Sequence, residues 1–148
     1  MRDSERFMPG LYSRLWNEYG TVGRFFFDSD SGTITAISRN GSGLSMILTD
    51  VGEGIRVDLG LGLSLVIPRD EPFELSDALA PVRSLIENGI TLYVPLEPTD
   101  DPVLRYMLEF PGGALSSRIP GREYTEFTVG GWSPFFGSGS SSCRSGAY

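Results

Sequence analysis

Five short β-rich runs within residues 22–67, separated by clusters of turn residues, constrain the fold of this chain more than any other feature. The turn clusters are 28–32, 40–43, 50–54 and 60–62. Runs of β-branched and aromatic residues with Gly, Asn and Asp at near-regular spacing are typical of an antiparallel meander. The Asn40-Gly41 pair also favours a tight hairpin turn. The sequence therefore predicts an antiparallel sheet on which the rest of the chain packs.

Two segments with apolar residues at helical spacing flank this meander. The first covers residues 9–19, where Pro9 suits the first turn of a helix. Its aromatic stripe allows two interpretations, a buried face or a docking helix, and burial is favoured because so short a helix needs tertiary packing. The second helix is predicted near residues 77–88, with Ser76 or Asp77 as its cap and Gly89 ending it.

Two further strands are predicted, near residues 90–96 and 122–129, and the charges of the second suggest an edge strand. Residues 111–120 have the turn markers of a loop. The runs 25–27 and 46–48 are apolar without alternation, which predicts central strands buried on both faces.

The predicted fold class is α+β, a mostly antiparallel sheet with both helices packed on it. The length is that of about one domain, predicted for residues 1–136. The Gly/Ser-rich tail, 137–148, is predicted to be disordered.

The residue types that are missing limit the chemistry of this chain. All 12 basic residues are Arg, and the sequence has no His and no Lys. A histidine-activated nucleophile, an imidazole metal site and a Schiff-base lysine are therefore excluded. We expect no metal and no cofactor, and a protein that is not an enzyme. The exclusive use of Arg is typical of GC-rich genomes and predicts a bacterial or phage source.

The net charge of −7 predicts the kind of partner. A field of this sign repels nucleic-acid phosphates and acidic membrane surfaces, so neither is an expected partner. A basic protein is the favoured partner, although an acidic surface also serves solubility. Cys143 is the only cysteine, so no internal disulfide can form. The charged N-terminal residues and the absence of a long apolar run lead us to expect a cytoplasmic protein.

Two groups of residues are candidates for contact with a partner. Glu97, Asp100 and Asp101 form an acidic cluster in a Pro-rich loop, where a solvated loop is the alternative interpretation. An aromatic group follows Gly130-Gly131 near the tail, and these side chains must be buried either in the core or in another molecule. The aromatic group consists of Trp132, Phe135 and Phe136.

These observations favour a small acidic binding protein of the bacterial immunity or inhibitor type, which neutralises a toxin or effector by direct binding. The first alternative is a hydrolase-like enzyme that uses only carboxylates, with Arg as an anion clamp. Its candidate residues are Glu97, Asp100, Glu123, Glu126 and Arg122. The second alternative is a structural subunit of a phage or secretion assembly.

Overall fold

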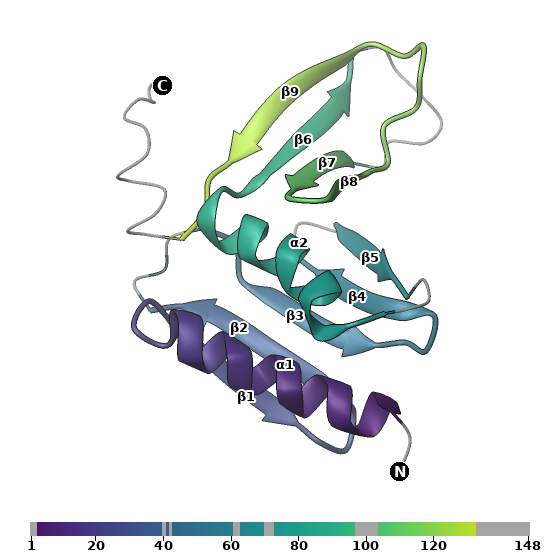
Figure 1. The fold of residues 1–148 in the computed structure, drawn as a ribbon. Coiled ribbons are helices and arrows are strands. Elements are labelled where there is room, and N and C mark those ends of the chain that lie inside the picture. The colour runs from purple at the N-terminus through teal and green to yellow at the C-terminus, as the bar shows by residue number, and fades with distance from the viewer. Residues whose placement is uncertain are drawn as a thin grey trace.

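The computed structural model describes residues 3–39, 41, 43–60, 63–69, 73–96 and 104–132, which form an α+β fold of helices and two antiparallel sheets (Figure 1). The helices are α1 (Asp3–Tyr19) and α2 (Leu75–Glu87). The first sheet contains β1 (Gly23–Asp28), β2 (Thr33–Ser38), β3 (Met46–Asp50), β4 (Gly54–Asp58) and β5 (Ser64–Pro68). The second contains β6 (Ile90–Pro95), β7 (Arg105–Phe110), β8 (Gly113–Ser116) and β9 (Tyr124–Val129).

The first sheet is the meander that the turn spacing predicts. Its strands follow one another in chain order, and each pairs antiparallel with the next. Asp28 pairs with Thr33 across the first hairpin, where the Asp30 N–H donates to Asp28 Oδ1 at 3.0 Å. Gly41 lies between β2 and β3 with φ +75°, a conformation that favours glycine.

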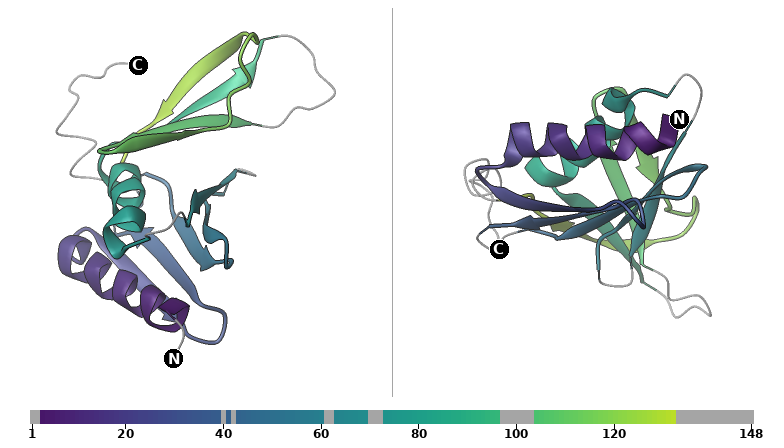
Figure 2. Two further views of the ribbon diagram at one scale, coloured as in Figure 1. Left: turned by 45° about the vertical axis from the view of Figure 1, so that its right-hand side comes forward. Right: turned by 90° about the horizontal axis from the view of Figure 1, so that it is seen from below.

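The two faces of the first sheet differ sharply. Alternate residues pack into one core beneath the helices, among them Phe25, Ile34 and Met46. The residues between them, including Phe26 and Ile47, are exposed. The prediction that the runs 25–27 and 46–48 are buried on both faces was therefore wrong. The helices cover one face only, and β1 is an edge strand (Figure 2).

Helix α1 begins earlier than the sequence indicates. It starts at Asp3, and Pro9 lies inside it. Met8, next to Pro9, is buried in the core, as are Leu11 and Leu15. Packing on both sides of the proline stabilises a helix that passes through it, although Pro9 lacks the N–H that an interior residue normally donates. The interpretation of the aromatic stripe as a buried face is supported by Tyr19, which is 3% exposed.

Helix α2 is bounded by local hydrogen bonds and by a glycine. The helix starts two residues earlier than predicted, and its N-cap is Glu74, where the sequence predicted Ser76 or Asp77. Asp77 lies in the first turn, and its carboxylate accepts from the Glu74 N–H at 2.7 Å. Gly89 follows the helix with φ +85°, and its N–H donates to the Ser84 and Leu85 carbonyls. The predicted end of this helix is confirmed.

The second sheet has the strand order β8-β7-β6-β9. The strands predicted near 90–96 and 122–129 are β6 and β9, and β9 is an edge strand as expected. The loop predicted over residues 111–120 was partly wrong, because β8 pairs there with β7 through a two-residue turn. Helix α2 packs against β7 and lies between the two sheets (Figures 1 and 2).

Trp132 closes the core at the end of the described chain. Its side chain is fully buried, and its ring centroid lies 5.9 Å from that of Phe25. The indole Nε1 donates to the Leu44 carbonyl at 2.8 Å, and the backbone N–H donates to the Ile86 carbonyl at 2.6 Å. A Cβ on Gly23 would come 2.2 Å from the indole, so this strand start has room only for glycine. Trp132 thus joins β1, the segment that precedes β3 and the end of α2.

Candidate functional site

The exposed face of the first sheet, opposite the helices, is the candidate site, and we call it the outer face. Its centre is defined by strand register, since Phe26 pairs with Thr35 and Thr35 pairs with Ile47. Directly paired residues point to the same side of a sheet. Ile37 is two residues from Thr35 on β2, so it belongs to the same face. The outer face therefore presents three neighbouring apolar side chains around one threonine.

All three apolar side chains at this centre are accessible. Phe26 is 52% exposed, Ile47 is 42% exposed and Ile37 is 38% exposed. Val66 on β5 is a fourth exposed apolar residue. It lies on the outer face because it pairs with Arg56, which is on that face. Single exposed apolar residues are ordinary, but a group of them on one uncovered sheet face is typical of a contact surface.

Charged residues surround the apolar centre of the outer face. Arg24 pairs with Ile37, and Asp58 pairs with Ile47. Arg56 Nε lies 3.2 Å from Asp58 Oδ2, and both side chains are well exposed. Such exposed ion pairs contribute little to stability, so these groups remain available to another molecule. An apolar centre with a charged rim is the usual composition of a protein–protein interface.

A second feature is a hollow of about 530 Å³ between α1 and the turns of the first sheet. It is lined by Met8, Pro9, Phe27, Ser29, Asp30, Ser31, Gly32, Asp50, Gly52 and Arg69. Arg69 Nη2 lies 3.3 Å from Asp50 Oδ2, and both side chains are largely buried. The Asp50 Oδ1 atom accepts from the Gly52 N–H at 2.9 Å. The charges of Asp50 and Arg69 therefore compensate each other.

Arg69 is also held by two aromatic rings. Its guanidinium lies 5.5 Å from the ring centroid of Phe7 and 5.4 Å from that of Phe73, and the two rings stack on each other. These cation–π contacts join α1 to the segment that precedes α2. Among the described residues, Arg69 Nε has no hydrogen-bond partner. The arrangement fits a structural clamp better than a reactive group, because the guanidinium is already paired.

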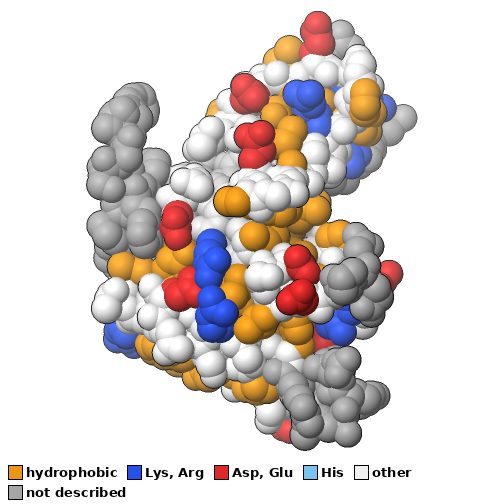
Figure 3. Space-filling model, in the orientation of Figure 1, with side chains coloured by type: hydrophobic (Ala, Val, Ile, Leu, Met, Phe, Trp, Pro, Cys, Tyr) orange, Lys and Arg blue, Asp and Glu red, His pale blue; other side chains and the backbone are white. Residues whose placement is uncertain are grey.

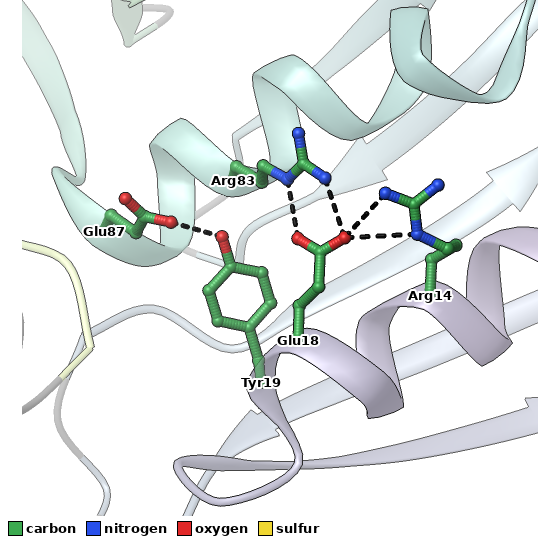
Figure 4. Close-up of polar contacts among 5 residues, drawn as sticks. All are labelled: Arg14, Glu18, Tyr19, Arg83 and Glu87. Atoms are coloured by element: carbon green, nitrogen blue, oxygen red, sulfur yellow. Dashed lines mark hydrogen bonds and ion pairs between the residues drawn. The ribbon is translucent and has the colours of Figure 1, made fainter.

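A polar network joins the two helices (Figure 4). Glu18 on α1 accepts hydrogen bonds from Arg83 on α2 at 2.7 Å and from Arg14 at 2.8 Å. The hydrogen bond from Arg83, supported by Arg14, lowers the pKa of Glu18. The Tyr19 hydroxyl donates to the Glu87 carboxylate. Arginine and acidic side chains accordingly gather on the surface over the junction of α1 and α2 (Figure 3).

Burial, and then the hydrogen bond to Glu87, raises the pKa of Tyr19 above its ordinary value of 10.0. The folded state therefore holds the phenol proton more tightly than the unfolded state does. This contribution to stability is complete below about pH 10 and is lost as the pH rises toward the folded-state pKa.

The Tyr19→Phe variant is expected to lose about 1–2 kcal/mol of unfolding free energy at neutral pH, because Glu87 loses its donor. The difference between wild type and variant should shrink between about pH 8 and about pH 11. Urea unfolding of both proteins at the two pH values measures it. Other tyrosines are common to both proteins and cancel in the difference. If the difference in unfolding free energy between the two proteins stayed constant with pH, the pKa of Tyr19 would not be raised in the folded state.

Most of the predicted contact residues lie outside the described part of the chain. These residues are Glu97, Asp100, Asp101, Phe135 and Phe136. The tail predicted over 137–148 also lies outside it. For Trp132 the sequence allowed the core or a partner as its surroundings, and the structure shows the core. Its indole is therefore not part of the surface that another molecule could contact.

The carboxylates proposed for an enzyme are not gathered in the described structure. Glu123 and Glu126 are both exposed, and Glu126 lies on the edge strand β9, opposite Tyr93 of β6. Burial, then a hydrogen bond to Glu126, raises the pKa of Tyr93. Glu97 and Asp100 lie outside the described residues. The described part of the chain thus supplies no observation that favours the carboxylate enzyme.

Sequence reasoning missed the outer face. The signal was present in the runs 25–27 and 46–48, where an apolar residue stands at a position that alternation assigns to the exposed side. Such runs were interpreted as strands covered on both faces, since that is their usual environment. The same pattern arises when the second face is left uncovered for a partner.

Within the described residues, no helix is long and apolar enough to cross a membrane. The same residues contain no group of three or more His, Cys, Asp or Glu side chains that could hold a metal ion. Comparison of the chain with known proteins found no matching family model, no matching curated protein and no matching solved structure.

Proposed function

We propose that this chain is a non-enzymatic protein-binding module of the immunity or inhibitor type, which neutralises a toxin or effector by covering it with the outer face. The observation that carries the proposal is the apolar centre of that face. Phe26, Ile37 and Ile47 lie side by side, exposed, on a sheet face that the helices leave uncovered.

Removal of this centre from water would supply the binding energy. Burial of apolar surface stabilises a complex by about 25 cal/mol per Å² before the costs of association. Phe26 is the natural anchor because it is the largest of the three side chains and the most exposed. The centre is formed by paired strands, so little conformational entropy would be lost when a partner binds.

Charge would set the choice of partner. The net charge of −7 speeds the capture of a basic protein and disfavours acidic ones. Arg24 places a positive group on the outer face, where Asp58 offsets the charge of Arg56, so the partner would also present a carboxylate opposite Arg24. A bacterial source and a cytoplasmic location remain predictions from the sequence.

Affinity capture with the immobilised full chain, followed by calorimetry with the purified partner, tests this proposal. The double variant Phe26→Thr/Ile47→Thr is expected to weaken binding roughly 100-fold, because it removes the apolar centre but keeps β-branched residues in both strands. Binding should also weaken between about 50 mM and about 500 mM salt. The partner's toxic or catalytic activity should fall in proportion to the chain added.

The matched control is Val94→Thr/Phe127→Thr, which removes two exposed apolar side chains from the second sheet. This control is expected to bind like wild type. Equal affinity for both double variants would place the contact elsewhere. A chain that retains no protein, or a bound partner whose activity is unaffected, would overturn the proposal.

A further inference from the structure

The free edge of β9 belongs to the second sheet and is separate from the outer face. Strand β9 ends the order β8-β7-β6-β9, and no strand among the described residues pairs with its outer side. Thr125, Glu126, Phe127 and Thr128 are all exposed. An unpaired edge presents backbone donors and acceptors that can extend the sheet with another strand.

The hydrogen bonding of β9 decides which backbone groups point outward. Just past the last paired residues of β6 and β9, the Leu96 N–H donates to the Glu123 carbonyl at 3.1 Å, so Glu123 bonds toward β6. Residues of an antiparallel pair alternate between bonding the partner strand and pointing away from it. Residues 125, 127 and 129 therefore bond β6. The N–H and C=O groups of the alternate residues, Tyr124, Glu126 and Thr128, point to the free edge.

We propose that β9 pairs antiparallel with β9 of a second copy of this chain, joining the two second sheets into one continuous sheet. Only the outward residues can bond across the new interface, so they must pair with one another. Directly paired residues point to the same side of a sheet, so pairing outward residues with one another places the same face of both copies on the same side of the joined sheet. A second copy meets this requirement by twofold symmetry.

Charge selects the register of this pairing. A twofold axis at Glu126 would place two like charges directly opposite each other, which is unfavourable. An axis at Phe127 pairs Glu126 with Thr128 of the second copy and Thr125 with Val129. It also brings the two Phe127 side chains together as a non-hydrogen-bonded pair, the closer kind. The axis at Phe127 is therefore the assigned one.

Apolar side chains support the same assignment. Phe127 is paired with Leu92, and Val94 follows two residues later on the same face of β6. Phe127 is 52% exposed and Val94 is 39% exposed. The twofold axis at Phe127 would bring these side chains of the two copies together into one apolar strip. The apolar side chains of each copy would then be buried by the same side chains of the other copy. The strand of an unrelated protein would not provide this match by symmetry.

Thr128→Pro tests the pairing, because it removes an outward N–H without taking a bond from β6. Sedimentation equilibrium of the full chain should show a dimer. The variant should weaken the dimer at least about tenfold, since two symmetry-related bonds are lost. Thr128→Ala keeps the N–H and should dimerise like wild type. A wild-type chain that stays monomeric up to about 1 mM would overturn the proposal, as would a dimer equally stable in both variants.

Cysteine crosslinking tests the register and does not depend on the folding of the proline variant. In a Cys143→Ser background, Phe127→Cys should form a disulfide-linked dimer in air, because paired Cβ atoms lie within about 5.5 Å. Thr125→Cys and Glu126→Cys should crosslink much more slowly, since each faces a different residue of the second copy. Equal rates for all three, or fastest crosslinking through residue 126, would contradict the axis at Phe127. Dimerisation and partner binding fail separately, because they use different sheets.

Discussion

Replacement of Trp132 with Ala is expected to lower the free energy of unfolding by about 3–5 kcal/mol, the range for buried large aromatic side chains. The indole is fully buried against Phe25, and its Nε1 donates to the Leu44 carbonyl. The variant loses both the packing and the hydrogen bond. It also leaves a cavity beside Gly23, where the backbone has no side chain to fill it. Urea unfolding followed by circular dichroism measures the change.

Phe26→Ala is the matched control for this experiment. It removes an aromatic side chain from β1, next to Phe25, but Phe26 is 52% exposed and lies on the outer face. Its effect on stability is expected to stay below about 1 kcal/mol. If Trp132→Ala cost no more than the control, the tryptophan would not close the core as described.

Gly89→Ala is expected to cost about 2–4 kcal/mol, the second large effect on stability. Gly89 has φ +85°, where other residues are strained, and a Cβ there would lie 1.8 Å from the Val129 carbonyl oxygen. The atom in the way belongs to the backbone of β9, so the strand itself would have to move. Thermal and urea unfolding of the variant provide the test.

Gly32→Ala separates the two causes. Gly32 also has a positive φ, +65°, but nothing lies within 4 Å of a Cβ built on it. This control isolates the conformational cost of about 1 kcal/mol. The loss of unfolding free energy in Gly89→Ala beyond that in Gly32→Ala then measures the clash with β9. Equal losses in the two variants would show that α2 and β9 approach less closely at this point.

The parts of the fold that local chemistry determines could be predicted from the sequence. The turn residues correctly predicted the five strands of the meander, and Gly89 correctly predicted the end of α2. The sequence predicted a single sheet, whereas β6 and β9 belong to a second one, together with β7 and β8, which were not predicted. Residues 111–120 were interpreted as a loop, although β8 pairs there with β7. Strand β8 is too short to give a periodic signal of its own, so only its pairing with β7 reveals it.

The candidate site was harder to predict than the fold. Whether a face of a sheet is covered depends on where the helices pack, and a pattern of residues in one strand does not contain that information. Phe25 and Phe26 are adjacent and chemically identical, yet one is buried and the other is 52% exposed. For Trp132 the difficulty was similar, since its indole Nε1 donates to the carbonyl of Leu44, which lies 88 positions away in the chain.

That same separation matters while the protein is being synthesised. At about 5–20 residues per second, the 88 positions between Leu44 and Trp132 take roughly 4–18 s to translate. During this interval the first strands can pair, but the space beside Phe25 has no indole to fill it. A nascent chain would therefore expose apolar surface for seconds, which is long enough for a chaperone or another nascent chain to bind it. Completion of the core, and resistance to proteolysis with it, should come only once Trp132 has left the ribosome.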